Sequence, residues 1–456
     1  MGQAPGAYAT GANQGRPLSP IRLVIVHWRC ADRKRENLLT PPVKSAIVFQ
    51  ELEILEEDCM KWIPLYGSIV LSSMLLATET AGRFPNIPED YLQEADSIPE
   101  FWLSTLEEVN RFLDGHIHTG MVATIGTTAG GRQIRAVCYG QPRHGKGTTT
   151  FSGSLGFGDV RTYTGPGAEK RVYLGIAGVH GGEFEGIVGM VNLLAVLETG
   201  TDLRGRSWPE ITAAARSLDR IIIIPVMNAD GRARVPLRMG RHRGSDETIP
   251  EYFNTGGWPD GRNIGWPDCK QFIPLDFSRT QFPGGYPNDN GINIQHDDFF
   301  GQRQPETEAL LGLAARERPD LILNMHTGAV FPLMHRPFAE PALTPVFEKL
   351  FRLVQTGLTE RGLQATNDPR TEADPVRVGT PSPYNLDTAL NLHCGALSVV
   401  IESPSHAAST AKRDGKPFLF TPDDLLNAQL LCHQQAMKFL VDTGGRSRWT
   451  PPTRRE

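Results

Sequence analysis

Three polar residues that can bind a metal ion or transfer a proton stand at the ends of apolar segments. The run RVYLGIAGV ends at His180, LILNM ends at His326, and ALSVVI ends at Glu402. His180 also begins the tetrapeptide His-Gly-Gly-Glu, so Glu183 follows it after two residues. An imidazole or carboxylate that is buried at such a place needs a partner. A shared metal ion would supply one.

Zinc is the metal that suits these side chains. It accepts imidazole nitrogen and carboxylate oxygen, and a catalytic zinc site keeps one position open for water. Glycines let the backbone curl so that His180 and Glu183 reach one ion. Glu185 is a rival carboxylate, but its longer spacing suits a tight site less well. Taken alone, the tetrapeptide also fits a loop with a capping glutamate.

The hydrophobic pattern predicts the elements that position these residues. Short apolar runs predict buried strands near 171–180, 220–228, 321–326 and 396–403. Two more strands flank a Gly-Gly turn within 121–140, and helical spacing predicts helices over 98–115, 184–200, 304–316, 341–363 and 422–441. This alternation predicts an α/β fold, with a mixed, largely parallel central sheet and helices on both faces. Ligands of such sheets bind at the carboxyl ends of the strands.

The order of the motifs HGGEFEG, PVMNADG, PLDFSR, QPETEAL, NMHTG and VVIES resembles that of the zinc carboxypeptidase family, over about residues 98–440. The resemblance implies a carboxypeptidase-like α/β/α sandwich and one zinc ion bound by His180, Glu183 and His326. It implies that Glu402 is the general base. One departure is Ala229, which stands where the family has proline.

The family grips the terminal carboxylate of its substrate with an Asn-Arg pair, and the matching residues here are Ser278 and Arg279. A planar guanidinium suits bidentate binding of a carboxylate, whereas Ser278 is a departure. A second family arginine polarises the scissile carbonyl, and Arg262 fits it by spacing. Three other arginines compete with Arg262 for this role: Arg238, Arg241 and Arg243. A solvated loop charge is an equally good interpretation of Arg262.

Two further positions follow from the resemblance. Tyr384 is the nearest match to the family's mobile tyrosine, although a packing tyrosine in a Pro-rich turn is an alternative. Asp387 lies near the side-chain specificity position, where it would favour a basic substrate residue. A helix cap or a solvated carboxylate is its more common role. Four other histidines lack ligand spacing or a place at a strand end and are expected to be structural or at the surface: His296, His335, His393 and His406.

The composition of the chain argues against several classes of protein. The 456 residues carry a formal net charge of -5 and are 39% hydrophobic, which argues against bulk electrostatic binding of nucleic acid, a polytopic membrane protein and a disordered chain. The six cysteines include no CxxC pair and indicate no disulfide framework. The expected organisation is a doubtful or disordered extension at 1–59, a possible signal peptide at 60–81, a linker at 82–97, the catalytic domain at 98–442 and a disordered tail at 443–456.

These patterns predict a zinc metallocarboxypeptidase that removes the C-terminal amino acid from peptides. One alternative is a zinc amidase or deacylase of N-acyl amino acids or cell-wall peptides. Another is a non-catalytic binding domain on the same scaffold. The expected substrate carries a free carboxylate, and we expect neither nucleic-acid binding nor a stable membrane span. If Met60 is the true start, the protein is expected to be periplasmic or extracellular, and otherwise cytoplasmic. The oligomeric state is left open.

Overall fold

The computed structural model describes residues 84, 86–147, 151, 159–244, 248–271, 273–329, 332–363, 384–408, 410–413 and 416–450. These residues all belong to the unit Ile63–Glu456, one of two into which the chain divides. The expected extension at 1–59, the possible signal peptide at 60–81 and the end of the tail at 451–456 lie outside the described residues.

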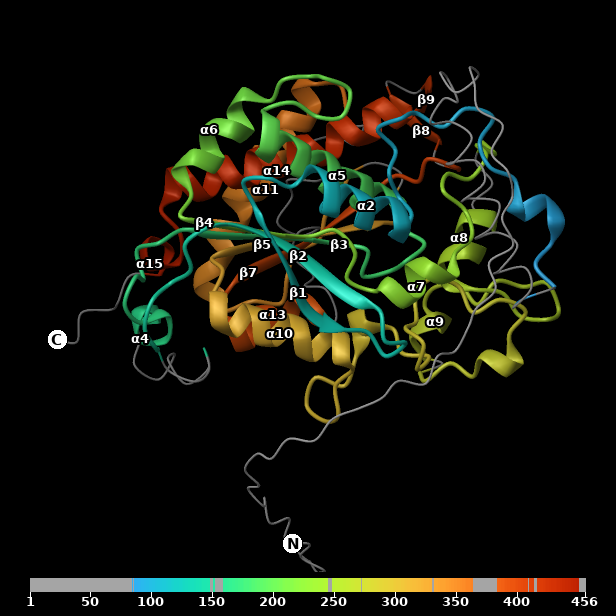
Figure 1. Ribbon diagram of the computed structural model, residues 1–456, viewed down its shortest axis with the longest axis horizontal. Coiled ribbons are helices and arrows are strands. Elements are labelled where there is room, and N and C mark those ends of the chain that lie inside the picture. The colour runs from blue at the N-terminus through green and yellow to red at the C-terminus, as the bar shows by residue number, and fades with distance from the viewer. Residues whose placement is uncertain are drawn as a thin grey trace, which may run out of the picture. The chain divides into compact units, whose positions relative to one another are not determined.

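Within the described residues, a seven-stranded mixed sheet forms the centre of the fold (Figure 1). Its strands are β1 (Met121–Thr127), β2 (Gln133–Gly140), β3 (Val172–Ala177), β4 (Arg220–Ile224), β5 (Leu321–Thr327), β6 (Leu333–Met334) and β7 (Leu397–Ser403), in the spatial order β1-β2-β4-β3-β5-β7-β6. The central strands β4, β3, β5 and β7 run parallel to one another. Strands β1, β2 and β6 pair antiparallel with their neighbours.

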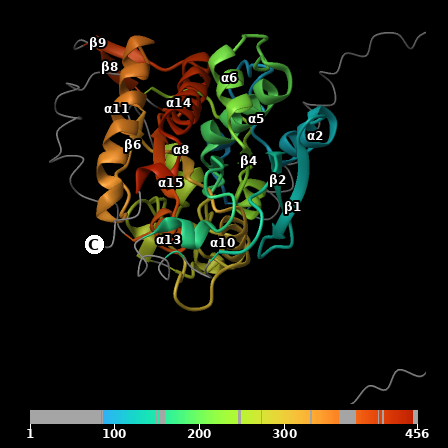
Figure 2. The same ribbon diagram turned by 90° about the vertical axis from the view of Figure 1, so that its left-hand side faces the viewer.

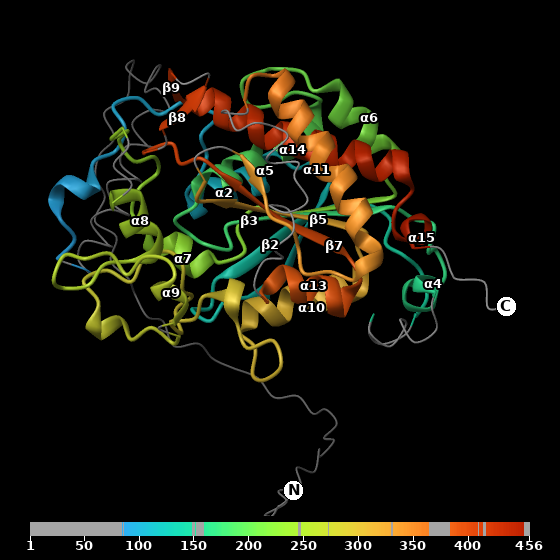
Figure 3. The same cartoon turned by 180° about the vertical axis from the view of Figure 1, so that it is seen from behind.

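Helices cover both faces of this sheet (Figures 1 and 3). One face carries α2 (Leu106–His116), α5 (Phe184–Thr199), α6 (Pro209–Ser217), α11 (Thr344–Glu360) and α14 (Pro422–Thr443). The other face carries α10 (Pro305–Glu317) and α13 (Leu386–Cys394). In Figure 2 the β1–β2 edge of the sheet lies on the right and α11 on the left. This arrangement confirms the predicted fold class.

The apolar strands are continuous because both of their faces are buried. Successive side chains of a strand point to opposite faces, so Tyr173 and Ile221 join the core beneath α5 and α14. Their neighbours Leu174 and Ile222 join the core formed with α10 and α13. Each strand therefore contributes alternate side chains to the two helical layers. The polar residues at the ends of these strands lie at the carboxyl end of the sheet.

Shorter elements connect this framework. They are the 3-10 helices η1 (Glu89–Leu92), η2 (Phe277–Arg279), η3 (Ile294–His296) and η4 (Pro341–Leu343), the helices α4 (Val160–Thr164), α7 (Ala229–Arg234), α8 (Thr248–Thr255), α9 (Asp268–Gln271) and α15 (Arg446–Trp449), and the strands β8 (Thr410–Arg413) and β9 (Lys416–Leu419). Most of the segment 229–300, which lacks periodicity, forms such short helices and irregular connections. No described helix is both long and apolar enough to cross a membrane.

Both ends of the domain are more ordered than their composition predicts. In the expected linker 82–97, the Glu94 carboxylate accepts hydrogen bonds from the backbone N–H groups of Arg238 and Met239, each at 2.7 Å. In the expected disordered tail, Arg446 is buried in α15 and donates to Glu340 at 2.8 Å. The prediction of disorder is therefore wrong for 446–449, because Arg446 has a distant acidic partner that local composition does not reveal.

Candidate metal centre

Three side chains meet at the carboxyl ends of β3 and β5. His180 Nδ1 lies 2.8 Å from Glu183 Oε1, and His326 Nδ1 lies 3.0 Å from Glu183 Oε2. The two imidazole Nδ1 atoms are 3.2 Å apart. All three side chains are almost fully buried. Among the described residues, this is the one group of three or more His, Cys, Asp or Glu side chains with the geometry of a metal site.

The loop between β3 and α5 carries two of these residues. Gly181 and Gly182 pack so closely against neighbouring backbone that a side chain would not fit. A Cβ atom on Gly181 would lie 2.1 Å from the backbone nitrogen of Arg232, and one on Gly182 would lie 2.7 Å from Asn254 Cα. The glycines thus allow the tight curl that the tetrapeptide predicts. Glu183 is the N-cap residue of α5.

The ladder between β5 and β7 brings the third histidine beside Glu402. His326 and Glu402 are direct partners in this parallel register. The Glu402 side chain is 22% exposed. His335, which was expected to be structural or at the surface, has its Nε2 atom 3.8 Å from Glu402 Oε1. The fold therefore places the partly accessible Glu402 carboxylate next to the three-residue cluster, and the His335 imidazole next to that carboxylate.

Burial and the cluster's own charges shift the proton equilibria in opposite directions. Burial lowers the pKa of His180 and is only partly offset by Glu183. Burial by itself would lower the pKa of His326. The nearby carboxylates, Glu183 foremost, have the larger combined effect and raise this pKa to about 9. The two imidazoles hold the pKa of Glu183 far below its ordinary value, although burial opposes this. Burial raises the pKa of Glu402 to about 7, and the Glu183 and Asp387 carboxylates add to this effect.

The donor set fits a zinc ion. Two bonds of about 2.0–2.1 Å at a tetrahedral angle place their ligand atoms about 3.3 Å apart. The separation of 3.2 Å between the imidazole nitrogens is close to this value, and the carboxylate oxygens need to move by only a few tenths of an ångström. Two neutral imidazoles and one carboxylate are also a combination that zinc accepts. His180, Glu183 and His326 are therefore suited to hold the ion together.

Several contacts that orient the cluster were not predicted from the sequence. Asn254 Nδ2 donates to Glu183 Oε1 at 3.0 Å, and the Thr327 N–H donates to Glu183 Oε2 at 3.1 Å. His180 Nε2 lies 3.1 Å from Asn293 Oδ1, which leaves Nδ1 facing the cluster. The Tyr286 ring stacks on the His180 ring with centroids 3.6 Å apart. Three of these residues belong to the irregular segment 229–300, whose length was the only signal of their importance.

The expected substrate-binding residues lie outside this cluster. Ser278 and Arg279 are exposed in η2, and Ser278 Oγ donates to Asp276 at 2.7 Å. The Arg279 side chain forms no hydrogen bond or ion pair with another described residue. Arg262 is 78% exposed and pairs with Asp260 at 2.8 Å, which is the arrangement of a solvated loop charge. None of these residues is bonded to the cluster within the described part of the chain.

Neither Tyr384 nor Asp387 forms a hydrogen bond with the cluster among the described residues. The Tyr384 ring packs against Phe299 and Phe300, with centroids 5.8 and 5.4 Å away, as expected of a packing tyrosine.

Asp387 is neither a helix cap nor solvated, because it is buried in the first turn of α13. Its carboxylate accepts hydrogen bonds from Gln295 at 2.9 Å, Asn324 at 3.0 Å and Ser398 at 2.6 Å. These bonds tie α13 to the strands that carry His326 and Glu402.

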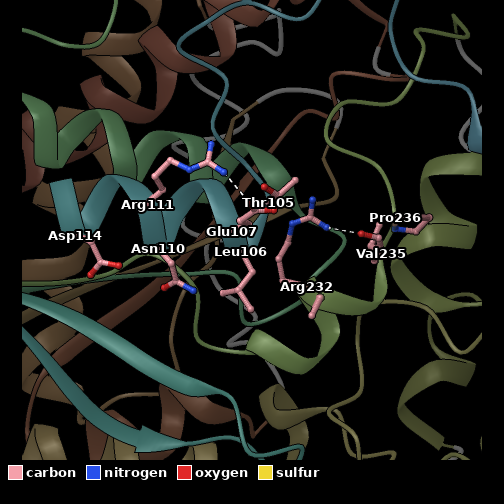
Figure 4. Close-up of a pocket in the computed structure, with 10 residues that line it drawn as sticks. Thr105, Leu106, Glu107, Asn110, Arg111, Asp114, Arg232, Val235 and Pro236 are labelled. Atoms are coloured by element: carbon pink, nitrogen blue, oxygen red, sulfur yellow. Dashed lines mark hydrogen bonds and ion pairs between the residues drawn. The ribbon is translucent and has the colours of Figure 1, made fainter. Parts of the chain in front are cut away.

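One well-defined pocket lies away from the metal cluster. It has a volume of about 570 Å³ and lies between α2 and the segment that includes α7 (Figure 4). Glu107 and Arg111 form an ion pair on its α2 side, and Arg232 donates to the Val235 carbonyl at 3.0 Å (Figure 4). Neither the three cluster residues nor Glu402 lines it. This pocket therefore does not mark the chemical site, and the side-chain cluster is the better guide to it.

Comparison with known proteins gives the following matches. The chain matches the zinc carboxypeptidase family over residues 116–374. It matches no curated protein. Among solved structures, a metallo-carboxypeptidase from Burkholderia cenocepacia is 16% identical with a TM-score of 0.46, covering 74% of this chain and 70% of that one. Carboxypeptidase A from Helicoverpa armigera is 12% identical with a TM-score of 0.40, covering 82% and 81%.

The family match contains the His180–Glu183 loop and His326, and it ends before Glu402. It extends over more than half of the 456 residues. The side chains that the resemblance assigns to zinc are also the ones that the fold brings together, from two separate strands. The chain therefore belongs to the zinc carboxypeptidase family and is a zinc hydrolase.

Proposed function

We propose that this protein is a metallocarboxypeptidase that hydrolyses the C-terminal peptide bond of its substrates. The observation that carries the proposal is the cluster of His180, Glu183 and His326 beside Glu402. These three residues would hold one zinc ion, which as a Lewis acid would lower the pKa of water and polarise a carbonyl group.

Glu402 is the proposed general base. Its carboxylate is partly accessible to solvent, and burial raises its pKa to about 7. A carboxylate with this pKa can accept a proton from the attacking water and later return it to the leaving amine near neutral pH. Neighbouring His335, 3.8 Å away, can exchange protons between Glu402 and solvent. Each transfer uses a group that the fold already places beside the cluster.

Arg279 is the proposed anchor for the substrate's terminal carboxylate. Its exposed guanidinium forms no hydrogen bond or ion pair with a described side chain, although Asp276 lies near enough to interact with its charge, so it can bind an external carboxylate without first breaking an ion pair. Ser278 departs from the family's asparagine and bonds to Asp276 instead. Recognition of the carboxylate would therefore depend on Arg279 with less help from its neighbour. Arg262 is not proposed to polarise the carbonyl, because its guanidinium already pairs with Asp260 at 2.8 Å.

The same centre could serve a zinc amidase or deacylase that acts on N-acyl amino acids, which also carry a free carboxylate. The Ser278 departure is the feature that favours this second candidate. The two activities differ in what lies on the amino side of the scissile bond. A peptidase requires a peptide there, whereas a deacylase accepts a simple acyl group.

The decisive experiment measures zinc content and two activities in the same preparation. Purified protein would be incubated with short peptides and with N-acyl amino acids of matched C-terminal residue, and the released amino acid would be quantified with and without a chelator. Release from peptides that the chelator abolishes supports the carboxypeptidase. Release from N-acyl amino acids alone supports the deacylase, and a zinc-loaded protein that cleaves neither class would indicate a non-catalytic binding domain.

A further inference from the structure

Glu185 lies two residues after the proposed ligand Glu183 and is not part of the cluster. Its side chain is 1% exposed, so its carboxylate is effectively shielded from water. A buried carboxylate needs several hydrogen-bond donors to remain stable. The partners of Glu185 are Thr327 and His406, which belong to the two segments that carry the ligand His326 and the proposed base Glu402.

Each oxygen of Glu185 has its own partners. Oε1 accepts hydrogen bonds from the backbone N–H of His406 at 2.6 Å and from His406 Nδ1 at 2.8 Å. Oε2 accepts a hydrogen bond from Thr327 Oγ1 at 2.8 Å. Thr327 directly follows His326 in β5, and His406 follows Glu402 after the end of β7. One carboxylate thus joins α5 to the segments that end two neighbouring strands.

The ring of His406 is held in one tautomer. Its Nε2 atom accepts a hydrogen bond from the Gly240 N–H at 2.9 Å, so Nε2 carries no proton. The proton therefore resides on Nδ1 and is donated to Glu185. The ring also packs against Phe184 and Trp102, with centroids 5.5 and 5.2 Å away. Both nitrogens of His406 are hydrogen-bonded and its ring is packed against two aromatic side chains, which makes it a rigid bridge rather than a free imidazole.

Thr327 connects Glu185 directly to the proposed metal ligands. Its hydroxyl donates to Glu185, while its backbone N–H donates to Glu183 Oε2 at 3.1 Å. The orientation of the Glu183 carboxylate therefore depends on the position of Thr327, and that position depends on Glu185. Outer contacts of this kind alter metal affinity by about 10–100-fold when they are removed.

We propose that Glu185 is a positioning residue for the zinc centre, acting through Thr327 on the ligand Glu183 and through His406 on the segment that carries Glu402. The inference rests on the proposed zinc site but not on the identity of the substrate. Glu185 is not a ligand itself, because its oxygens are taken up by the threonine hydroxyl and the histidine.

The test compares three variants with the unaltered protein. Glu185→Gln preserves the shape but places an amide N–H₂ against either Thr327 or His406. Thr327→Val removes only the hydroxyl link, and Thr327→Ser restores it. Zinc affinity would be measured by competition with a chelating dye, and the Co²⁺-substituted proteins would be compared by their visible absorption spectra, which report ligand geometry.

Glu317→Gln is a matched control at the amino end of the parallel strands, opposite the proposed zinc centre. Glu317 is a buried carboxylate that pairs with Arg220, the first residue of β4, at 2.8 Å. We expect the loss of this ion pair to destabilise the fold without altering the contacts of the zinc centre. We expect Glu185→Gln to weaken zinc binding about tenfold or more and to change the Co²⁺ spectrum. Thr327→Val is expected to reproduce part of this loss, whereas Thr327→Ser and Glu317→Gln are expected to retain the affinity of the unaltered protein.

The outcomes separate two kinds of failure. Unchanged zinc affinity and an unchanged Co²⁺ spectrum in Glu185→Gln would overturn the positioning role, as would equal losses in Glu185→Gln and Glu317→Gln. If Glu185→Gln does not fold, Thr327→Val with the affinity and spectrum of the unaltered protein would overturn it instead. An unaltered protein that binds no zinc would overturn the proposed function itself.

Discussion

Replacing Glu402 by glutamine removes the proposed base and leaves the shape of the side chain almost unchanged. The register between β5 and β7 is made by backbone groups, so it does not depend on the carboxylate. Glu402 is also not one of the three clustered residues. We therefore expect Glu402→Gln to fold and to bind one zinc ion.

The expected loss of activity is large. A positioned general base contributes about 10²–10⁴-fold to the rate. This range corresponds to about 3–5.5 kcal/mol of activation free energy, at 1.36 kcal/mol for each factor of ten. A glutamine amide cannot accept the proton of the attacking water near neutral pH. We expect kcat to fall about 10³-fold and KM to change little, since the proposed carboxylate anchor is Arg279.

The same substitution should stabilise the metal-free protein at alkaline pH. Burial raises the pKa of Glu402 from 4.5 to about 7. Between these two pH values the carboxyl group ionises more readily in the unfolded chain than in the folded chain. The free energy of unfolding therefore falls as the pH rises from 4.5 to about 7, and above pH 7 the ionised side chain destabilises the folded protein. The shift corresponds to at most about 3.4 kcal/mol, and the 22% exposure of the side chain reduces it. We expect a gain of about 1–2 kcal/mol in the free energy of unfolding at pH 8.

Three measurements check this reasoning. Elemental analysis gives the zinc content, steady-state kinetics on a peptide give kcat and KM, and urea unfolding of the metal-free proteins at pH 5 and pH 8 gives the stability difference. The gain in stability should be close to its full size at pH 8 and only about a quarter as large at pH 5. Near-normal hydrolysis by zinc-loaded Glu402→Gln would refute the assignment of the base, whatever the stability data show.

Three other predictions concern the metal and the substrate. His180→Ala and His326→Ala should each lose zinc by elemental analysis, and full occupancy in both would refute the ligand set. Because His326 in the metal-free protein keeps a proton up to about pH 9, zinc binding must displace it. The apparent affinity should therefore rise about tenfold per pH unit between about pH 7.5 and 8.5, and a flat profile would contradict the proposed ion pair. Arg279→Ala should raise KM about tenfold or more for substrates with a free carboxylate, whereas Arg262→Ala should leave kcat within about threefold; the reverse pattern would exchange their roles.

The buried strands and the proposed ligands could be predicted from the sequence because each leaves a local signal. Continuous apolar runs mark β3, β4, β5 and β7, and the polar residues His180, His326 and Glu402 interrupt or follow those runs. The first helix was expected from residue 98, but α2 begins at Leu106. The capping box of Thr105 and Glu108 explains this boundary and is itself readable from the sequence.

Contacts between distant segments left no such signal. Asn254 and Tyr286 belong to an irregular segment whose path is set by tertiary contacts rather than by periodicity. Arg446 lies in a Gly-rich basic stretch that resembles a disordered tail, but its guanidinium packs over the Phe151 ring, with its Cζ atom 5.0 Å from the centroid, and pairs with Glu340. Pattern analysis does not predict such partners, because the contact depends on where two remote segments lie in the folded chain.

The parallel pairing of His326 with Glu402 has a consequence for the tolerance of this fold to insertions and deletions. Adding or deleting one residue inside β7 before Glu402 would turn that side chain to the other face of the sheet, away from the centre. Changes of length in the connections after the strands leave the pairing of β5 with β7 untouched. The chemistry is therefore sensitive to indels in these two short strands, as it is to any change of the two-residue spacing between His180 and Glu183.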